Sequence, residues 1–428
     1  AAICPPICSR SPRSRGGGRA MKIVYIHQYF NTLEMSGGTR SFEMARRLVA
    51  RGHEVHVMTS WREPGKDTAW FVTKEEGIHV HWLPVTYSNH MRNRDRVKAF
   101  VRFAFNATAR ASSLPCDVIF ATSTPLTVAI PAIAASIRRK TPMVFEVRDL
   151  WPALPIAIGA LRNPIGKFAA RLLEKAAYSR ATSIVALSPG MRDGVIARNV
   201  SPEKVVVIPN SCDNEDHANS EAGGLAFRAK RAWLGHRPLL VYCGTFGRIN
   251  GVQTLVDIAA ELQRISPETR VLLVGSGQEE GNLKTRARAN GTLDRNLFIE
   301  PSIPKRDVPA LLAASTMACS FFVDLPEMRA NSANKFFDGL AASRPIVINH
   351  GGWMADLLAA TGAGLVVWRL SPRHAARRIA SALADADWLA HARHAAKRLA
   401  TEDFDRDLLA DNLERVLVAA AHPARGAA

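Results

Sequence analysis

Short apolar segments alternate with longer amphipathic segments along most of this 428-residue chain. The apolar segments include MKIVYIHQYF at 21–30, DVIFATS at 117–123 and PLLVYCGTF at 238–246. Most of them are apolar at consecutive positions, which is typical of parallel strands that are buried on both faces. The segments between them, such as 39–51 and 251–265, have apolar residues at helical spacing. This alternation predicts repeated βαβ units and therefore an α/β fold with parallel sheets.

A polar segment, SCDNEDHANSEAGG at 211–224, interrupts the alternation. Its polar, acidic and Gly-ended composition is typical of a linker. We therefore expect two Rossmann-like domains, at 21–210 and 225–402, followed by a C-terminal helix and tail at 403–428. Residues 1–20 are rich in Arg, Gly, Ser and Pro and lack the apolar core of a secretory signal. We expect them to be a disordered or non-native tail.

Composition narrows the class of protein. Apolar residues make up 47% of the chain, but no apolar run approaches the ~20 residues that a membrane-spanning helix needs. The cysteines are scattered apart from the pair Cys4 and Cys8, which has no partner cluster. That usage predicts reduced thiols in a cytosolic protein. The formal net charge of +18 predicts an anionic partner, which is a nucleic acid, a membrane surface or a phosphorylated ligand.

Two loops in the first half are candidate binding sites, because ligands of open parallel sheets bind at the carboxyl ends of strands. After the first strand, Gly37 and Gly38 precede a helix and would let the backbone approach a ligand closely. The loop lacks the GxGxxG pattern, which disfavours a nicotinamide cofactor. A later strand ends in EVRDLWP, where Glu146, Arg148 and Asp149 are clustered. Either an internal ion pair shapes this loop, or Asp149 faces a ligand.

The first loop of the second half, YCGTFGRINGV, has the composition of a phosphate site. Gly244 and Gly247 flank the loop, and Arg248 lies just before the next helix. A guanidinium group beside the free N–H groups of a helix start is a typical phosphate ligand set.

A second candidate is the segment NSANKFFDGLAASRPIV, which predicts a helix that Ser332 or Asn334 caps. Lys335 then lies in the first turn, where the helix dipole disfavours a cation unless an anion is bound. Lys335 and Arg248 would then flank one phosphate group, and Asp338 would suit the hydroxyls of a ribose. The alternative is an exposed Lys–Asp pair on the helix surface.

The segment at 90–110, HMRNRDRVKAFVRFAFNATAR, is both basic and apolar. Helical spacing places four apolar residues on one face: Val97, Phe100, Val101 and Ala104. Three basic residues fall on another face: Arg94, Lys98 and Arg102. This helix would either lie on an anionic membrane or pack on the core with a basic outer face.

Taken in order, these motifs resemble the family 4 glycosyltransferases of the GT-B fold over residues 21 to about 422. MKIVYIHQYF and GGTR resemble the first strand and glycine loop of that family, and VVVIPNSCD resembles its inter-domain segment. LLVYCGTFGRINGV resembles the strand and loop that bind phosphate. EVRDLWP and SANKFFDGLAASRPIV are most similar to bacterial surface-polysaccharide transferases, including N-acetyl-L-fucosamine transferases.

The resemblance implies roles for individual residues. Arg248 and Lys335 would hold the diphosphate of the donor, Asp338 would bind its ribose, and Asp149 would contact the transferred sugar. The implied donor-binding residues are Gly37, Gly38, Gly244, Gly247, Arg248, Lys335 and Asp338. The implied catalytic residues are Asp149, Arg248 and Lys335, with Glu146 and Arg148 as candidates on the acceptor side. The sequence departs from the family at Ala330, where an acid is usual, and at Asn250, where a second lysine is usual.

The resemblance also implies two domains that face each other across a cleft, a C-terminal helix that crosses back to the N-terminal domain, and retention of anomeric configuration without a metal or cofactor. The expected reaction transfers a hexosyl or N-acetylhexosaminyl group from a nucleoside-diphosphate sugar, with UDP favoured over GDP. The acceptor would be a hydroxyl of a glycan or of a polyprenyl-diphosphate-linked saccharide in surface polysaccharide biosynthesis.

We expect a cytoplasmic protein, with possible peripheral attachment to the inner face of the plasma membrane through 90–110. Two other functions stay open. One is a sugar-nucleotide epimerase or hydrolase of the same fold, and the other is a non-catalytic anion-binding protein. A specific nucleic-acid partner is disfavoured, because the aromatic residues are not interleaved with basic residues on any strand.

Overall fold

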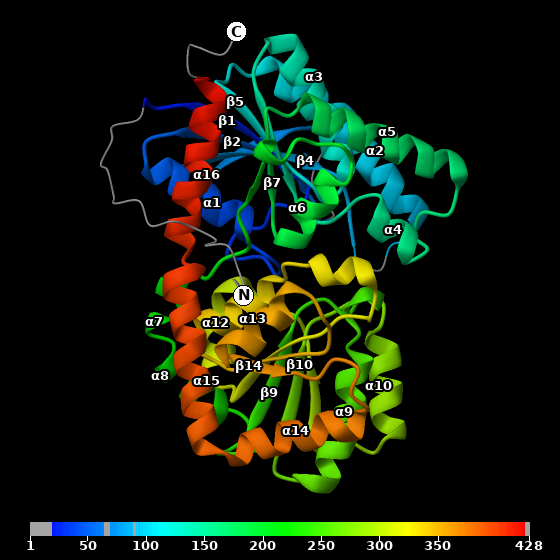
Figure 1. The fold of residues 1–428 in the computed structure, drawn as a ribbon, viewed down its shortest axis with the longest axis vertical. Coiled ribbons are helices and arrows are strands. Elements are labelled where there is room, and N and C mark those ends of the chain that lie inside the picture. Colours follow the sequence, from blue (N-terminus) through cyan, green and yellow to red (C-terminus); the bar gives the residue numbers. More distant parts are fainter. Residues whose placement is uncertain (1–18, 64–68, 89–90, 92, 424–428) are drawn as a thin grey trace. The chain divides into compact units, whose positions relative to one another are not determined.

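The computed structural model describes residues 19–63, 69–88, 91 and 93–423. The predicted tail lies almost wholly outside the described residues, and so do Cys4 and Cys8. The described residues form two compact units (Figure 1). The N-terminal unit combines the described parts of Pro6–Thr32, Thr39–Pro209 and Asp407–Ala428, and the C-terminal unit combines Leu33–Gly38 with Asn210–Arg406.

The N-terminal unit is built on a sheet that has eight strands in the described residues, in the order β3-β4-β2-β1-β5-β6-β7-β8. Their bounds are β1 Lys22–Ile26, β2 Glu54–Trp61, β3 Phe71–Glu75, β4 Ile78–Pro84, β5 Val118–Thr122, β6 Met143–Val147, β7 Ser183–Ala186 and β8 Val205–Val207. β1 pairs in parallel with both β2 and β5, and Ile23, Val24, Tyr25 and Ile26 have no exposed surface. The predicted α/β fold with parallel, doubly covered strands is therefore confirmed.

One strand of this sheet runs against the others. β3 pairs with β4 in the antiparallel direction, and Glu76 and Gly77 form the turn between them. Its sequence, FVTKE, alternates half-buried and exposed residues, as an edge strand with one face in water does. A search for continuous apolar runs does not find such a strand, and the sequence analysis did not predict it.

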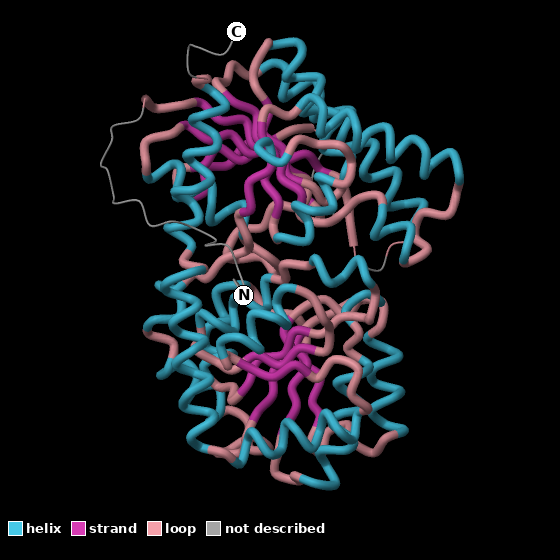
Figure 2. Tube along the Cα trace, viewed as in Figure 1, coloured by secondary structure: helices cyan, strands magenta, loops and turns pink. Residues whose placement is uncertain are grey.

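Helices cover both faces of the sheet (Figures 1 and 2). Those of the N-terminal unit are α1 Arg40–Ala50, α2 Asn93–Ser113, α3 Ala129–Arg139, α4 Ala153–Ala157, α5 Pro164–Arg180, α6 Pro189–Ile196 and α16 Arg406–Ala421. α1 and α16 lie on one face, and α2, α3 and α5 lie on the other (Figure 1). α3 packs against both α2 and α5.

The packed face of α2 differs from the predicted one. Its buried stripe consists of Ala99, Phe103, Ala104, Ala107 and Ala111. Val97 and Val101, which were predicted to share a face with Ala104, are instead 56% and 58% exposed. The helix has apolar residues on more than one side, so spacing alone does not identify the side that packs. Four of the five residues of this stripe are alanines, and Phe103 is its one large side chain.

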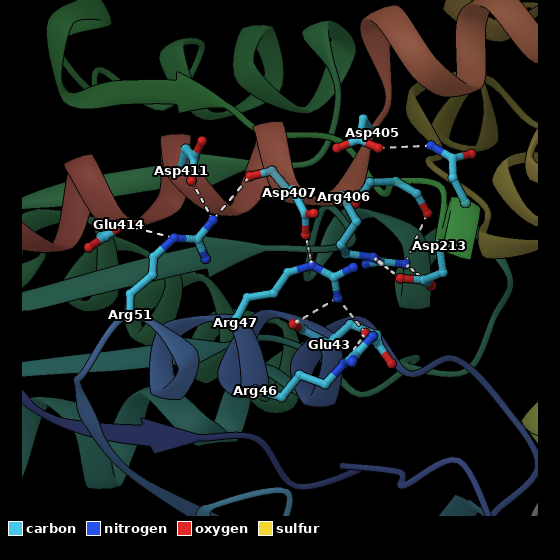
Figure 3. Close-up of polar contacts among 12 residues, drawn as sticks. Glu43, Arg46, Arg47, Arg51, Asp213, Asp405, Arg406, Asp407, Asp411 and Glu414 are labelled. Carbon is cyan, nitrogen blue, oxygen red and sulfur yellow. Dashed lines mark hydrogen bonds and ion pairs between the residues drawn. The ribbon is translucent and has the colours of Figure 1, made fainter. Parts of the chain in front are cut away.

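The last helix returns to the N-terminal unit, as predicted. In Figure 3, Arg51, which directly follows α1, reaches Asp411 and Glu414 of α16, and the distance from Arg51 Nε to Glu414 Oε2 is 3.2 Å. Arg47 bonds to Asp407 in the same way, one helical turn earlier. Because several charges act together, these ion pairs should stabilise the fold more than an isolated surface pair does. The median contribution of such an isolated pair to the free energy of unfolding is about 0–1 kcal/mol.

The C-terminal unit has a parallel sheet with six strands in the described residues, in the order β11-β10-β9-β12-β13-β14. The strands are β9 Leu239–Cys243, β10 Arg270–Val274, β11 Leu297–Glu300, β12 Met317–Ser320, β13 Ile346–Ile348 and β14 Gly364–Val366. The helices are α7 Asn214–Ala218, α8 Glu221–Ala229, α9 Gln253–Ile265, α10 Glu280–Ala289, α11 Val308–Ala313, α12 Asn334–Ala341, α13 Trp353–Thr361, α14 Pro372–Ala384 and α15 Ala386–Arg398. Side chains of α9, α14 and the strands form one buried apolar cluster.

The segment predicted as a linker, 211–224, contains α7 and the first part of α8. Its start is fixed within the C-terminal unit by a buried ion pair, in which Arg406 Nη2 lies 2.7 Å from Asp213 Oδ2 (Figure 3). The side chains of Arg406 and Asp213 are only 3% and 4% exposed. Polar composition alone does not show that these acids have a buried partner far along the chain.

Candidate functional site

Lys335 lies in the first turn of α12, as its sequence predicts. The predicted side-chain cap is wrong, because the N-cap residue is Ala333 and no side chain caps the helix. The Ser332 hydroxyl accepts a hydrogen bond from the Asn210 backbone N–H at 3.2 Å instead. The first turn contains no acidic residue. The start of α12 therefore combines a helix dipole and an ammonium group of the same sign.

The ammonium group of Lys335 lies among aromatic rings. Its Nζ is 4.5 Å from the centroid of Phe322 and 5.1 Å from that of Tyr242. Among the described residues it has no ion pair or hydrogen bond. Burial lowers the pKa of Lys335 to about 8, although Cys243 and Asp338 act in the opposite direction. Cation–π contacts replace only part of the lost hydration, so an anion at this position would be strongly favoured.

The glycine loop after β9 packs directly against this lysine. A Cβ atom on Gly244 would lie 3.2 Å from Lys335 Cε. Gly251 has a φ of +55°, and its Cβ would lie 2.7 Å from the Phe322 carbonyl group. A Cβ on Gly247 would meet only Thr245, at 3.7 Å. Packing and backbone conformation therefore require glycine at Gly251, whereas a Cβ at Gly244 would press on the flexible Lys335 side chain and Gly247 leaves room beside the loop.

Arg248 begins a 3₁₀ turn, Arg248–Asn250, at the end of the same loop. Its side chain is 83% exposed, and its Nε lies 3.6 Å from Glu279 Oε1. This long contact leaves the guanidinium group free to reorient toward a ligand. Asn250, where the family usually has a lysine, is buried and donates to the Thr245 carbonyl. It stabilises the loop and offers no charge.

Asp338 has a partner that the sequence analysis did not identify. Lys305 Nζ lies 2.5 Å from Asp338 Oδ1, and the two side chains are 8% and 16% exposed. Burial alone would lower the pKa of Lys305, but Asp338 and Asp213 outweigh it and the net direction is upward. Lys305 lies 33 residues before Asp338, and no local sequence pattern indicates that it pairs with a residue of α12. The ribose-binding role of Asp338 stays a prediction.

The first glycine loop contacts the start of α12. Residues 33–38 belong to the C-terminal unit, where the backbone N–H of Lys305 donates to the Met35 carbonyl at 3.1 Å. A Cβ on Gly38 would collide with the side-chain amide of Asn334. Gly37, with a φ of +120°, precedes it. The structure thus brings Gly38 next to the residue that precedes Lys335.

Glu146 is part of the interior of the N-terminal unit. Arg40 donates to Glu146 Oε1 from Nε at 3.1 Å and from Nη2 at 2.9 Å, and neither side chain is exposed. Thr122 Oγ1 donates to the other carboxylate oxygen at 2.6 Å, and the Ile208 carbonyl accepts from Arg40 at 3.0 Å. An internal ion pair therefore exists at this strand end, and its cation is Arg40. Glu146 has no surface with which to contact an acceptor in this structure.

Arg148 and Asp149 directly follow β6, beside the carboxyl end of the neighbouring strand β5. Thr124 Oγ1 donates to Asp149 Oδ2 at 2.9 Å, and burial raises the pKa of Asp149 against the opposing effects of Thr124 and Arg148. Arg148 Nη1 lies 3.3 Å from Nε2 of His27. His27 follows β1 directly and was not singled out in the sequence, where an isolated histidine in a strand carries no signal.

Comparison with known proteins supports one class of enzyme. Residues 37–211 match the family described as glycosyl transferase 4-like domain, and residues 237–385 match glycosyl transferases group 1. Escherichia coli (strain K12) WcaI, named as a colanic acid biosynthesis glycosyl transferase, is 24% identical over 65% of this chain and 71% of its own length. Alpha-D-kanosaminyltransferase of Streptomyces kanamyceticus is 24% identical over 48% of this chain and 51% of its own.

The fold leads to the same class. The structure of Anabaena HepE in complex with UDP and glucose superposes with a TM-score of 0.70 at 16% identity, and covers 93% of this chain and 99% of that one. At this identity the likeness shows the fold alone, which is two Rossmann-like domains of the GT-B type. With both halves of the chain matched to glycosyl transferase domains, this protein belongs to the family 4 glycosyltransferases of the GT-B fold.

Proposed function

We propose that this protein is a retaining, metal-independent glycosyltransferase that uses a UDP-sugar and transfers its hexosyl or N-acetylhexosaminyl group to a hydroxyl of a glycan or lipid-linked acceptor in surface polysaccharide biosynthesis. The observation that carries the proposal is the partly buried Lys335 ammonium, which has no anionic partner in the described residues and lies against Gly244. HepE, a structural neighbour, binds UDP, and WcaI is named for a polysaccharide pathway.

The difficult step is departure of the nucleoside diphosphate as the glycosidic bond breaks. Lys335 and the N–H groups at the start of α12 would stabilise the negative charge that develops on the leaving oxygen. Arg248, which is exposed and close to the same loop, would reorient to bind the second phosphate. Asp338 would accept a ribose hydroxyl with the carboxylate oxygen that Lys305 leaves open, and Asp149 would contact the transferred sugar.

The proposal predicts a characteristic pH dependence of UDP binding. The free protein has a Lys335 pKa of about 8, and a bound diphosphate would raise it, so the protonated form binds more tightly. Affinity should therefore be highest below about pH 8 and fall as the pH rises through that value, by up to about tenfold per pH unit. Calorimetric titrations with UDP and GDP at about pH 7 and about pH 9 measure this dependence.

The matched control for this titration is Lys335→Met, which keeps the length of the side chain without its charge. This variant should bind UDP more weakly than the wild type, and its UDP affinity should no longer decrease above about pH 8. A wild-type protein that binds neither nucleotide would contradict the proposed donor. A decrease that persists in Lys335→Met would assign the titration to another group.

We further propose that the N-terminal unit acts on an anionic membrane surface through α2 and α5. Phe105 of α2 is 80% exposed, and Ile165 and Phe168 of α5 are 76% and 69% exposed. Basic residues directly adjoin exposed apolar residues in the sequence of both helices. They are Lys98 and Arg102, next to Val97 and Val101 on α2, and Lys167 and Arg171, next to Phe168 and Leu172 on α5. No helix in the described part of the chain meets the length and hydropathy that crossing a bilayer requires, so attachment would be interfacial.

Vesicle sedimentation tests this attachment. The protein should sediment with vesicles that contain phosphatidylglycerol and remain in solution with pure phosphatidylcholine, since each basic residue near an anionic surface contributes about 1 kcal/mol. The double variant Val101→Ser with Phe105→Ser should bind several-fold more weakly. Leu225→Ser is the control, because Leu225 is 70% exposed but belongs to the C-terminal unit. Equal binding of wild type and double variant would exclude α2 as the contact.

A further inference from the structure

Phe322, two residues after β12, is held at both of its backbone polar groups by one side chain. Its N–H donates to Asn349 Oδ1 at 2.8 Å, and its carbonyl accepts from Asn349 Nδ2 at 2.9 Å. Asn349 directly follows β13, and the backbone pairing of β12 with β13 ends at Ser320 and Ile348. The side-chain amide, which both donates and accepts, therefore continues the pairing beyond the strand ends. We call these two hydrogen bonds the Asn349 clasp.

Two further contacts fix the position of Phe322. The backbone N–H of Val323 donates to the Ile249 carbonyl at 3.0 Å, which ties this segment to the loop after β9. The ring of His350 packs on the ring of Phe322 at a centroid distance of 5.3 Å and an interplanar angle of 70°. Only 5% of Phe322 is exposed. Together with the Asn349 clasp, these contacts leave the Phe322 ring little freedom to move.

The fixed ring determines the surroundings of Lys335. Lys335 Nζ lies 4.5 Å from the centroid of Phe322 and 5.1 Å from that of Tyr242, whose hydroxyl donates to the Thr245 carbonyl at 2.9 Å. The two rings take the place of water around the ammonium, and burial is the main cause that lowers the pKa of Lys335 to about 8. An ammonium that is desolvated in advance loses less hydration when an anion binds, so the contact costs less to form.

The titratable groups around Lys335 do not account for this lowered pKa. Cys243 is neutral, because burial raises the pKa of its thiol to about 12. Burial lowers the pKa of His350, so its ring is neutral as well. Asp338 acts to raise the pKa of Lys335 and is itself paired with Lys305. The aromatic surroundings are therefore the feature that distinguishes Lys335 from an exposed lysine.

We propose that Asn349 is a positioning residue for Lys335 and acts through Phe322. Its clasp holds the aromatic ring against the ammonium, so that Lys335 is desolvated before a nucleoside diphosphate binds. The inference rests on the proposed function for the identity of the anion. The state of Lys335 in the free protein, however, can be measured without any nucleotide.

The pH dependence of lysine acetylation measures this state in the full chain. Only the unprotonated amine reacts with acetic anhydride, so the rate of Lys335 acetylation, measured by mass spectrometry relative to a free lysine peptide, follows the pKa of Lys335. The midpoint should lie near pH 8 in the wild type. It should rise by about one pH unit or more in Asn349→Ala and in Phe322→Leu, because water then reaches the ammonium. The double variant should show little further rise, since changes in one coupled unit are not additive.

Asn296→Ala is the matched control. Asn296 Nδ2 makes a similar buried hydrogen bond to the Ala259 carbonyl at 2.8 Å, but it directly precedes β11 and so lies at the opposite edge of the sheet. This variant should lower the melting temperature as Asn349→Ala does, while the Lys335 midpoint stays at the wild-type value. A purely structural role of Asn349 would make the two variants behave alike.

UDP binding supplies the second measurement. UDP affinity at about pH 7 should fall several-fold in Asn349→Ala, because the hydrated ammonium must then lose water on binding. The inference is overturned if the Lys335 midpoint is the same in the wild type, Asn349→Ala and Phe322→Leu, if the two single shifts add in the double variant, or if the midpoint shifts without any change in UDP affinity. A wild-type protein that does not bind UDP would contradict the proposed donor, whereas the midpoints would still show whether Asn349 acts on Lys335.

Discussion

Replacement of Lys335 by alanine should lower turnover at least about tenfold while the fold stays intact. The ammonium group lies 4.5 Å from the Phe322 ring centroid and has no carboxylate partner among the described residues, so its removal breaks no native ion pair. A charge-assisted contact contributes about 1.5–3 kcal/mol, and about 1.4 kcal/mol corresponds to a tenfold change in rate. Initial rates of UDP release in the presence of donor and acceptor give the measurement.

The control for that variant is Lys284→Ala on α10, whose ammonium lies 2.7 Å from Glu280 Oε1 on the helix surface and is 40% exposed. It should keep wild-type turnover. Circular dichroism and the melting temperature should be unchanged in both variants. Wild-type turnover in Lys335→Ala would remove this lysine from the mechanism, whereas a large fall in melting temperature would show a structural role instead.

Replacement of Glu146 by alanine should lower the free energy of unfolding by about 3–5 kcal/mol, because it leaves the Arg40 guanidinium buried without its anion. Neither side chain has exposed surface, and Arg40 also donates to the Ile208 carbonyl. Asp193→Ala, which removes an exposed partner of Arg192, should change stability by less than about 1 kcal/mol. Urea unfolding of the three proteins compares these values.

That experiment also decides the place of Glu146 in the reaction. If Glu146 contacted an acceptor, its loss would reduce activity without a comparable loss of stability. A structural role predicts the reverse, since activity measured well below the unfolding transition would then follow the fraction of folded protein. The double variant Arg40→Met with Glu146→Leu should recover part of the lost stability, because apolar replacement of a buried pair is often tolerated.

Much of the fold was predictable because the sequences of the buried strands are continuous apolar runs. β1 and β9 are examples whose apolar sequences match their burial. β3 was missed because FVTKE alternates between half-buried and exposed positions, and its pairing with β4 is a long-range property. The prediction of which face of α2 packs was wrong for a related reason. When a helix has apolar residues on several sides, its sequence does not indicate which side contacts a neighbour.

The candidate site was predictable only where local physics was violated. Lys335 stood out because a cation in the first turn opposes the helix dipole, and the structure places it beside Gly244. Arg40, Lys305 and His27 violate no local rule. Arg40 pairs with Glu146, 106 residues away, and Lys305 pairs with Asp338, 33 residues away. These pairings, and the burial of His27, arise only once the strands are assembled.

The return of α16 has a consequence for biosynthesis. The chain leaves the N-terminal unit after Pro209 and re-enters it at Asp407, so the whole C-terminal unit is made before the N-terminal one can be finished. Until α16 emerges from the ribosome, Arg47 of α1 and Arg51, which follows α1, lack their partners Asp407 and Asp411. A nascent chain therefore carries an incomplete first half throughout translation, and that half matures last even though it is synthesised first.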